Sequence, residues 1–349
     1  MENKFYTITK NDLFDLFARL ALNNKVYVPY RKGDRLYFDE FDANKEDIIE
    51  LGIIRQSQPF KSFINKPRND VLSSPKEGAV PVIVAGVKGC DLSSLLLQDY
   101  VFMEGDYKDP FYIKNRENTT IIAGDCTVAK ETCFCLAMEG APYPQSYFDI
   151  ALAPIDNHFL AEVSTAKGMA IIDGYKTFFK SPSPRDIETR DANRKKVASQ
   201  VKEFIDKRGT PDTSRIKGAV TKNYANVQFW KDFSSTCVEC GACNLVCPTC
   251  HCFLLCDSKG NDSVERSRIW DACLYNTFAR VAGGANPRRH IHERLRNRFE
   301  KKFDFFPKTL GYYACTGCGR CVEACPGDID LREVLKGMVN GLWNKPPNE

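Results

Sequence analysis

The sequence lacks any long apolar run. Its longest mostly apolar stretch, residues 79–87, is far shorter than the roughly 20 residues that a membrane-spanning helix needs. The first residues, MENKFYTITKNDLFDLF, are charged and amphipathic, without the apolar core and small-residue cleavage site of a signal peptide. We therefore expect a cytoplasmic protein that has no membrane span.

Net charge is also low, at +4 over 349 residues, which argues against a nucleic-acid-binding protein. One basic run, Arg288–Lys302, holds seven Lys and Arg but lacks a series of interleaved aromatic residues on which bases could stack. This run indicates either a solvated helix whose cations offset nearby metal–thiolate charge or a docking surface for an acidic partner. The sequence contains neither the G-x-G-x-x-G fingerprint nor a P-loop.

Cysteine, in contrast, is abundant and unevenly distributed. Twelve of the 16 cysteines lie between Cys237 and Cys325 in tight clusters. Disulfide-dense proteins are usually small and secreted, and no export signal is present here. In a reducing compartment, such clusters indicate metal sites.

Two cysteine motifs share the spacing C-x2-C-x2-C-x3-C-P. Residues 237–248 read CVECGACNLVCP, and residues 315–326 read CTGCGRCVEACP. In this spacing the first three cysteines bind one [4Fe–4S] cluster, and the fourth ligates the other cluster. Paired zinc sites are the alternative, but zinc motifs usually separate two Cys-x-x-Cys knuckles. We therefore predict two clusters, one bound by Cys237, Cys240, Cys243 and Cys325 and the second by Cys315, Cys318, Cys321 and Cys247.

The sequence around the motifs resembles a known family. CPTCHCFLLCD continues the first motif, SRIWDACLYNTFARVAGGANPR lies between the motifs, and VAGVKGCDL and ETCFC occur upstream. From about residue 80 to the end, the chain resembles a family of anaerobic redox subunits, which includes the beta subunit of soluble sulfhydrogenases and an iron–sulfur subunit of the anaerobic sulfite reductase. The resemblance implies an electron-transfer subunit of a cytoplasmic oxidoreductase complex. Its expected partners are a flavin/NAD(P)-binding subunit and a hydrogenase- or sulfite-reductase-like catalytic subunit, with ferredoxin as a further candidate.

The upstream half predicts an α/β fold. Short apolar strands at residues 81–87 and 119–124 alternate with helical segments, as expected for a mainly parallel sheet. We expect four parts: a small α+β cap (1–78), an α/β module (79–182), a helical linker (183–225) and a helical two-cluster ferredoxin-like domain (226–349) with a long insertion (249–314) between its motifs.

Four further cysteines belong to the α/β module. Cys90 and Cys126 directly follow the predicted buried strands, and Cys133 and Cys135 come shortly after Cys126. Because ligands bind beyond the carboxyl ends of strands in such sheets, these four predict a third [4Fe–4S] cluster. Buried structural cysteines and a zinc site are the alternatives. Packing or outer-shell roles are expected for Cys250, Cys252, Cys256 and Cys273; the alternatives are that one of them replaces a regular ligand or that several hold a further group.

No residue is predicted to act as a general acid, base or nucleophile. A self-sufficient iron–sulfur oxidoreductase, with a substrate or flavin site in the α/β module, is the alternative function. A structural zinc protein is the third, and it predicts colourless material that contains zinc and no sulfide.

Overall fold

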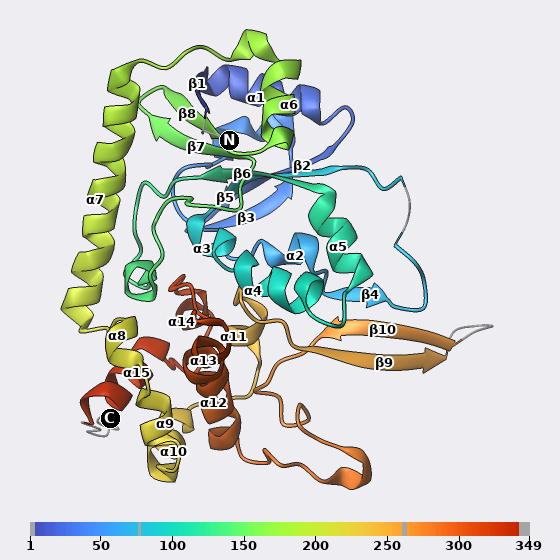
Figure 1. Cartoon of the computed structure of the whole chain (residues 1–349), viewed down its shortest axis with the longest axis vertical. Coiled ribbons are helices and arrows are strands. Elements are labelled where there is room, and N and C mark those ends of the chain that lie inside the picture. The colour runs from blue at the N-terminus through green and yellow to red at the C-terminus, as the bar shows by residue number, and fades with distance from the viewer. Residues whose placement is uncertain (1–3, 76–77, 260–263, 342–349) are drawn as a thin grey trace. The chain divides into compact units, whose positions relative to one another are not determined.

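The computed structural model describes residues 4–75, 78–259 and 264–341 (Figure 1). The chain divides into two compact units. Within the described ranges, no helix is both long and apolar enough to cross a membrane. The first unit comprises Met1–Lys66, Ser74–Glu131 and Gly140–Lys202, and the second comprises Pro67–Ser73, Thr132–Glu139 and Glu203–Glu349.

The first unit is built on a seven-stranded sheet with the order β1-β8-β7-β6-β5-β2-β3. The four central strands β2, β5, β6 and β7 run parallel, whereas β3, β8 and β1 pair antiparallel at the two sides. The predicted parallel α/β arrangement is thus confirmed for the centre of a mixed sheet. The strands are β1 (Lys4–Thr9), β2 (Lys25–Lys32), β3 (Arg35–Glu40), β5 (Val82–Val87), β6 (Thr119–Gly124), β7 (Ile150–Ile155) and β8 (His158–Val163).

This sheet crosses the boundary expected at residue 78. Strand β2 pairs in parallel with β5, with Lys25 opposite Val82 and Tyr27 opposite Val84. The alternating residues of β2 and β3 predict a local hairpin, and the two strands do pair in this way. The same residues contain no pattern that predicts pairing of β2 with a distant strand. The strands within residues 4–40, β1, β2 and β3, therefore belong to the same sheet as the strands that follow.

Helices cover both faces of the sheet (Figure 1). On one face α1 and α6 pack into a core with Val28 and Ile83. On the other face α2, α3, α4 and α5 pack around Val84 and Ile121. Both faces of the central strands are therefore buried, which explains their continuous apolar runs. The bounds are α1 (Lys10–Leu20), α2 (Lys61–Ile64), α3 (Gly89–Leu92), α4 (Leu95–Asp99), α5 (Pro110–Glu117) and α6 (Ala166–Gly174).

The second unit is mostly helical and holds both cysteine motifs. Its core contains Trp230, Phe299, Phe303 and Leu335. The long helix α7 (Pro184–Arg208) begins in the first unit and ends in the second. The further helices are α8 (Thr213–Ile216), α9 (Ala219–Asn223), α10 (Val227–Ser234), α11 (Ala242–Leu245), α12 (Ile291–Glu300), α13 (Phe306–Leu310), α14 (Arg320–Glu323) and α15 (Leu331–Asn340).

The segment between the motifs forms a hairpin followed by helices. Strands β9 (Phe253–Lys259) and β10 (Val264–Trp270) pair antiparallel, and β4 (Arg68–Asp70) adds a third strand next to β10. Helices α12 and α13 then lead to the second motif. The insertion thus has secondary structure of its own.

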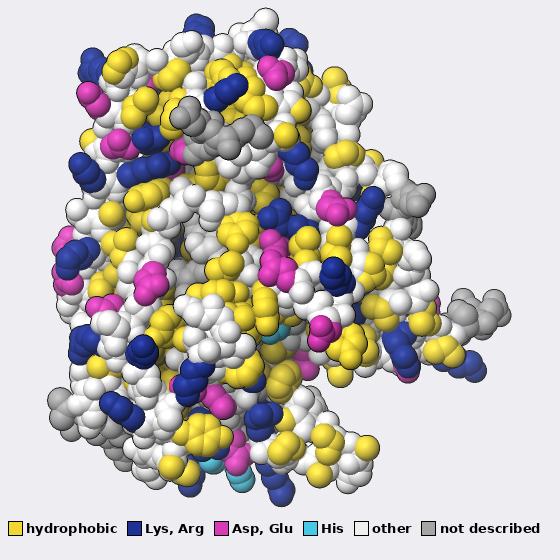
Figure 2. Space-filling view, in the orientation of Figure 1, with side chains coloured by type: hydrophobic (Ala, Val, Ile, Leu, Met, Phe, Trp, Pro, Cys, Tyr) yellow, Lys and Arg dark blue, Asp and Glu magenta, His cyan; other side chains and the backbone are white. Residues whose placement is uncertain are grey.

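Charge is mixed over the visible surface. On the face drawn in Figure 2, Lys and Arg side chains are scattered among Asp and Glu. This pattern agrees with the low net charge and produces no broad field of one sign on that face.

Candidate metal centre

Each cysteine motif forms a tight loop that leads into one short helix. Gly241 precedes α11 with φ 70°, and Gly319 precedes α14 with φ 74°. Both values lie in the left-handed region, which costs a residue with a Cβ atom about 1–2 kcal/mol. A side chain at Gly319 would also collide with the backbone of Thr132. The two glycines therefore give both motifs the same backbone turn directly after their second cysteine.

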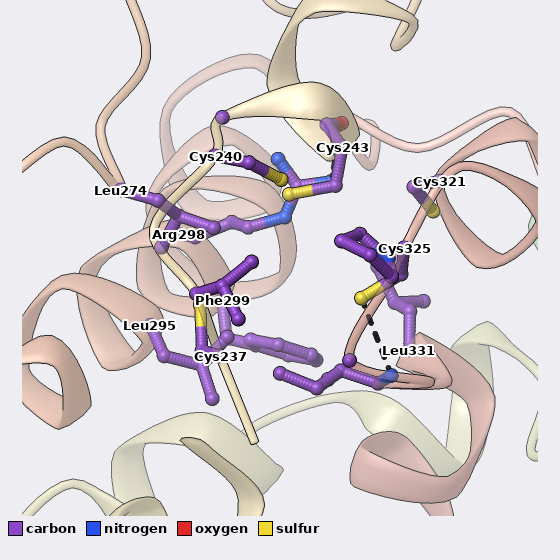
Figure 3. Close-up of a pocket in the computed structure, with 15 residues that line it drawn as sticks. Cys237, Cys240, Cys243, Leu274, Leu295, Arg298, Phe299, Cys321, Cys325 and Leu331 are labelled. Atoms are coloured by element: carbon purple, nitrogen blue, oxygen red, sulfur yellow. Dashed lines mark hydrogen bonds between the residues drawn. The ribbon is translucent and has the colours of Figure 1, made fainter. Parts of the chain in front are cut away.

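The first cavity is lined by five cysteines: Cys237, Cys240 and Cys243 of the first motif, and Cys321 and Cys325 of the second (Figure 3). Its other walls include the apolar side chains of Leu295 and Phe299. The Sγ atom of Cys325 accepts a hydrogen bond from the backbone N–H of Ile329 at 3.3 Å. This set includes the four thiols that the sequence predicts as ligands of one cluster, Cys237, Cys240, Cys243 and Cys325, and four thiolates suit a [4Fe–4S] cluster.

The second cavity is lined by Cys247, Cys315, Cys318 and Cys321. Cys247 comes from the end of the first motif, and the other three come from the second. Cys321 and Arg298 line both cavities. Clusters bound in the two cavities would consequently be close neighbours. The assignment of individual ligands stays a prediction.

Lys302 is a buried cation beside the second cavity. Its Nζ lies 3.3 Å from the Sγ of Cys247 and donates hydrogen bonds to Thr249 Oγ1 and the Ala314 carbonyl, each at 2.8 Å. Burial lowers the pKa of Lys302, but the nearby Cys247 and Cys250 outweigh burial and raise it above its ordinary value. Lys302 thus stays charged and offsets thiolate charge.

Arg298 is a second buried cation, with 4% of its surface exposed. Its Nη2 donates to the Cys243 carbonyl at 3.0 Å, and its Nη1 lies 3.7 Å from the Sγ of Cys250. Burial opposes its charge, yet Cys243 and Cys250 hold the pKa of Arg298 well above its ordinary value. Its position between the cavities allows one charge to act on both.

The sequence predicts that the basic run Arg288–Lys302 is either a docking surface or a solvated helix whose cations offset nearby thiolate charge, but it does not predict that some of these cations are buried. Arg294, Arg298 and Lys302 are all buried. They lie four residues apart, so they share one face of α12 and its continuation. This spacing, repeated next to thiolate motifs, is the sequence signal that could have found them.

Several of the cavity thiols have a pKa above that of a free cysteine. Burial raises the pKa of Cys315 to about 12, and it also raises the pKa values of Cys243 and Cys321. Cys247 differs, because a hydrogen bond from Cys250 and the charge of Lys302 hold its pKa well below the ordinary value. Iron must therefore displace protons from buried thiols when a cluster binds.

The cluster-free chain should lose stability as the pH rises above about 9. Cys315 loses its proton near 9.0 when unfolded but only near 12 when folded. Between these two pH values the folded state binds more protons than the unfolded state, so the free energy of unfolding falls as the pH rises. The total fall is about 1.4 kcal/mol for each unit by which the folded pKa exceeds the unfolded pKa. Denaturant unfolding at pH about 8 and about 11 measures this fall. Cluster-loaded chain is the control, and a cluster-free chain equally stable at both pH values would contradict the expectation.

In the first unit, Cys90 and Cys126 lie at the carboxyl ends of neighbouring parallel strands. Cys90 is in the first turn of α3 after β5, and Cys126 follows β6. The buried Lys88 donates to the Leu51 and Asp125 carbonyls at 2.6 and 2.8 Å. Burial lowers the pKa of Lys88, and both Cys126 and Cys90 act against this shift. The two thiols therefore lie near one buried amine.

Cys133 and Cys135 belong to the second unit. Between them, Phe134 donates its backbone N–H to the Gly317 carbonyl of the second motif at 2.9 Å. The Cys133–Cys135 segment thus lies along the loop that carries Cys315 and Cys318. The four-cysteine set of the expected third cluster is divided between the units and stays a prediction.

Comparison with known proteins gives the family. A family model described as a 4Fe-4S dicluster domain matches residues 236–329, which include both motifs. The F420-dependent formate dehydrogenase subunit beta of Methanocaldococcus jannaschii is 22% identical over 182 residues, covering 51% of this chain and 38% of that protein. The Sulfhydrogenase 2 subunit beta of Pyrococcus furiosus is 30% identical over 336 residues, covering 94% of this chain and 96% of that protein. With this likeness over nearly its whole length, the chain belongs to the sulfhydrogenase beta subunit family and carries a 4Fe–4S dicluster domain.

Proposed function

We propose that the chain is the iron–sulfur electron-transfer subunit of an oxidoreductase complex. It relays single electrons through two [4Fe–4S] clusters, which connect a flavin/pyridine-nucleotide subunit with a hydrogenase- or sulfite-reductase-like catalytic partner. The observation that carries this proposal is the pair of cysteine-lined cavities that share Cys321 and Arg298. Both named relatives are themselves beta subunits, which supports a role inside a larger assembly.

The residues around the cavities suit reversible one-electron transfer. Each electron that enters a cubane adds one negative charge, and hydrogen bonds and nearby charges set how readily it enters. Arg298 and Lys302 supply fixed positive charge, and Ile329 supplies an N–H···S hydrogen bond. With clusters bound, these groups would stabilise the reduced state without taking part in bond making or breaking.

The division of work between subunits can be tested with purified components. The chain alone, loaded with clusters, is mixed anaerobically with NADH or NADPH while cluster absorbance is followed. We expect no reduction until the flavin-containing sister subunit is added, because the chain has no G-x-G-x-x-G fingerprint. Reduction of the isolated chain by either nucleotide, or a flavin that copurifies with it, would favour the self-sufficient enzyme instead.

We further propose that Cys90, Cys126, Cys133 and Cys135 hold a third [4Fe–4S] cluster. The position of Cys90 and Cys126 at adjacent strand ends, near the buried Lys88, supports this proposal. The Cys-x-Cys pair would supply the other two thiolates.

A Cys133→Ser/Cys135→Ser variant should bind about four fewer irons per chain than the unmodified protein, because one cubane is lost. Iron and acid-labile sulfide are measured on anaerobically purified material. Cys256→Ser is the matched control, since Cys256 lies in β9 and lines none of the cysteine cavities described above. Unchanged iron in the double variant would contradict the third cluster.

A further inference from the structure

Three cysteines outside the doubled motif line one cavity of the second unit. Cys250, Cys252 and Cys273 surround a space of about 270 Å³, together with His251 and Asn297. Cys250 and Cys252 come directly after the first motif, and Cys273 follows β10. The packing or outer-shell roles expected from the sequence do not explain why three thiols line the same cavity.

Asn244 shows that two of these thiols are close together. Its Nδ2 lies 3.0 Å from the Sγ of Cys273 and 3.7 Å from the Sγ of Cys250. The two sulfurs are therefore no farther apart than the sum of these distances, 6.7 Å.

His251 adds a fourth donor to the same cavity. Its Nδ1 lies 3.1 Å from the Thr249 carbonyl oxygen, which can only accept a hydrogen bond. In the neutral ring, Nδ1 therefore carries the proton and Nε2 keeps its lone pair. Metal-binding histidines commonly fix their tautomer in this way, by donating the other ring N–H to a backbone carbonyl.

The remaining walls also suit an anionic, ligand-filled site. Arg298 and Lys302 line this cavity and supply buried positive charge. Asn297 is 6% exposed, and its Oδ1 is buried with no hydrogen-bond partner in the part of the chain that the structure describes. An unsatisfied buried acceptor is unfavourable, and a water molecule held in the filled cavity could donate a hydrogen bond to it.

We propose that this cavity holds a further iron–sulfur cluster, ligated by the thiolates of Cys250, Cys252 and Cys273 and by Nε2 of His251. A single zinc ion holds its four donors at about 2.0–2.3 Å. Across residues 4–75, 78–259 and 264–341, no three His, Cys, Asp or Glu side chains are arranged to hold one metal ion. Wider spacing of the donors and the large cavity favour a cluster. Binding releases the three thiol protons to solvent.

The position of this site connects it to the two ferredoxin-type cavities. Arg298 lines all three. Cys250 is hydrogen-bonded to Cys247, the expected ligand from the first motif to the second cluster. A histidine ligand raises the potential of an iron–sulfur cluster, as in Rieske centres. The new cluster is therefore more easily reduced than the two ferredoxin-type clusters and would collect electrons from them.

The test compares Cys252→Ser/Cys273→Ser with the control Cys256→Ser, both purified anaerobically with clusters loaded. Cys250 is left in place because it contacts Cys247. We expect the double variant to lose about four irons and the matching sulfide per chain, while the low-temperature resonance signals of the two ferredoxin-type clusters persist. Unchanged iron would overturn the proposal, and so would the loss of zinc in place of iron.

A second variant keeps the test decisive if the double variant does not fold. His251→Cys retains four ligands, so the iron content should stay constant while the highest of the cluster potentials falls. A potentiometric titration that shows no shift in any potential would overturn the assignment of His251. Failure of this site would leave the two-cluster relay intact, because none of its ligands belongs to the doubled motif.

Discussion

Changing Cys247 to serine should remove the cluster of the second motif, although Cys247 belongs to the first. Cys247 lines the cavity of Cys315, Cys318 and Cys321, and its Sγ lies 3.3 Å from the Nζ of Lys302. Conversely, Cys325 belongs to the second motif but lines the cavity of the first. Each single variant should therefore lose about four irons, or keep a cluster with a shifted signal if serine oxygen replaces the thiolate.

Double variants decide whether the fourth cysteine of each motif binds the cluster of the other motif. Cys247→Ser combined with Cys318→Ser affects one ligand set twice, so the losses should not add. Cys247→Ser combined with Cys240→Ser affects both sets, so both clusters should be lost. The reverse pattern, in which the Cys240 pair loses one cluster and the Cys318 pair loses two, would show that each motif binds its own cluster and would contradict the crossed assignment.

The Lys302→Met variant should lower the reduction potential of the second cluster by on the order of 100 mV. At an effective dielectric constant of about 20, a unit charge about 6 Å away contributes about 3 kcal/mol, and 100 mV corresponds to about 2.3 kcal/mol per electron. Methionine keeps most of the side-chain volume and removes the charge beside Cys247. Spectroscopic redox titration of each cluster measures the shift.

Lys308→Met is the matched control for this prediction. Lys308 follows in α13, but its side chain is 63% exposed and pairs with Asp304 at the surface. Exposed pairs contribute little, because water and salt screen them. Potentials that fall equally in both variants, or stay constant in Lys302→Met, would show that the buried amine does not tune the cluster.

Local patterns explain which parts of the fold could be predicted. The central strands β5 and β6 are apolar throughout because helices cover both faces, and their short runs were recognised. Strand β1 was not expected, since it lies at the sheet edge and only one of its six residues is buried. The parallel pairing of β2 with β5 joins segments more than 50 residues apart, and no local pattern records such a pairing.

The candidate site was likewise predictable only in part from the sequence. Cysteine spacing identified the two motifs, and the matched 4Fe–4S dicluster domain agrees with them. The convergence of Cys250, Cys252 and Cys273 was not predicted, because Cys273 is separated from the others by the hairpin β9–β10. Burial of Arg298 and Lys302 depends on the packing of α12 against α10, which charge patterning alone does not reveal.

The most direct test of the relay is a redox titration of the purified, cluster-loaded chain, followed by electron paramagnetic resonance. The clusters in the two cavities that share Cys321 and Arg298 should contribute two reducible [4Fe–4S] signals that broaden each other once both clusters are reduced. Colourless protein that contains zinc and no sulfide, or a single reducible cluster in fully loaded chain, would contradict the account.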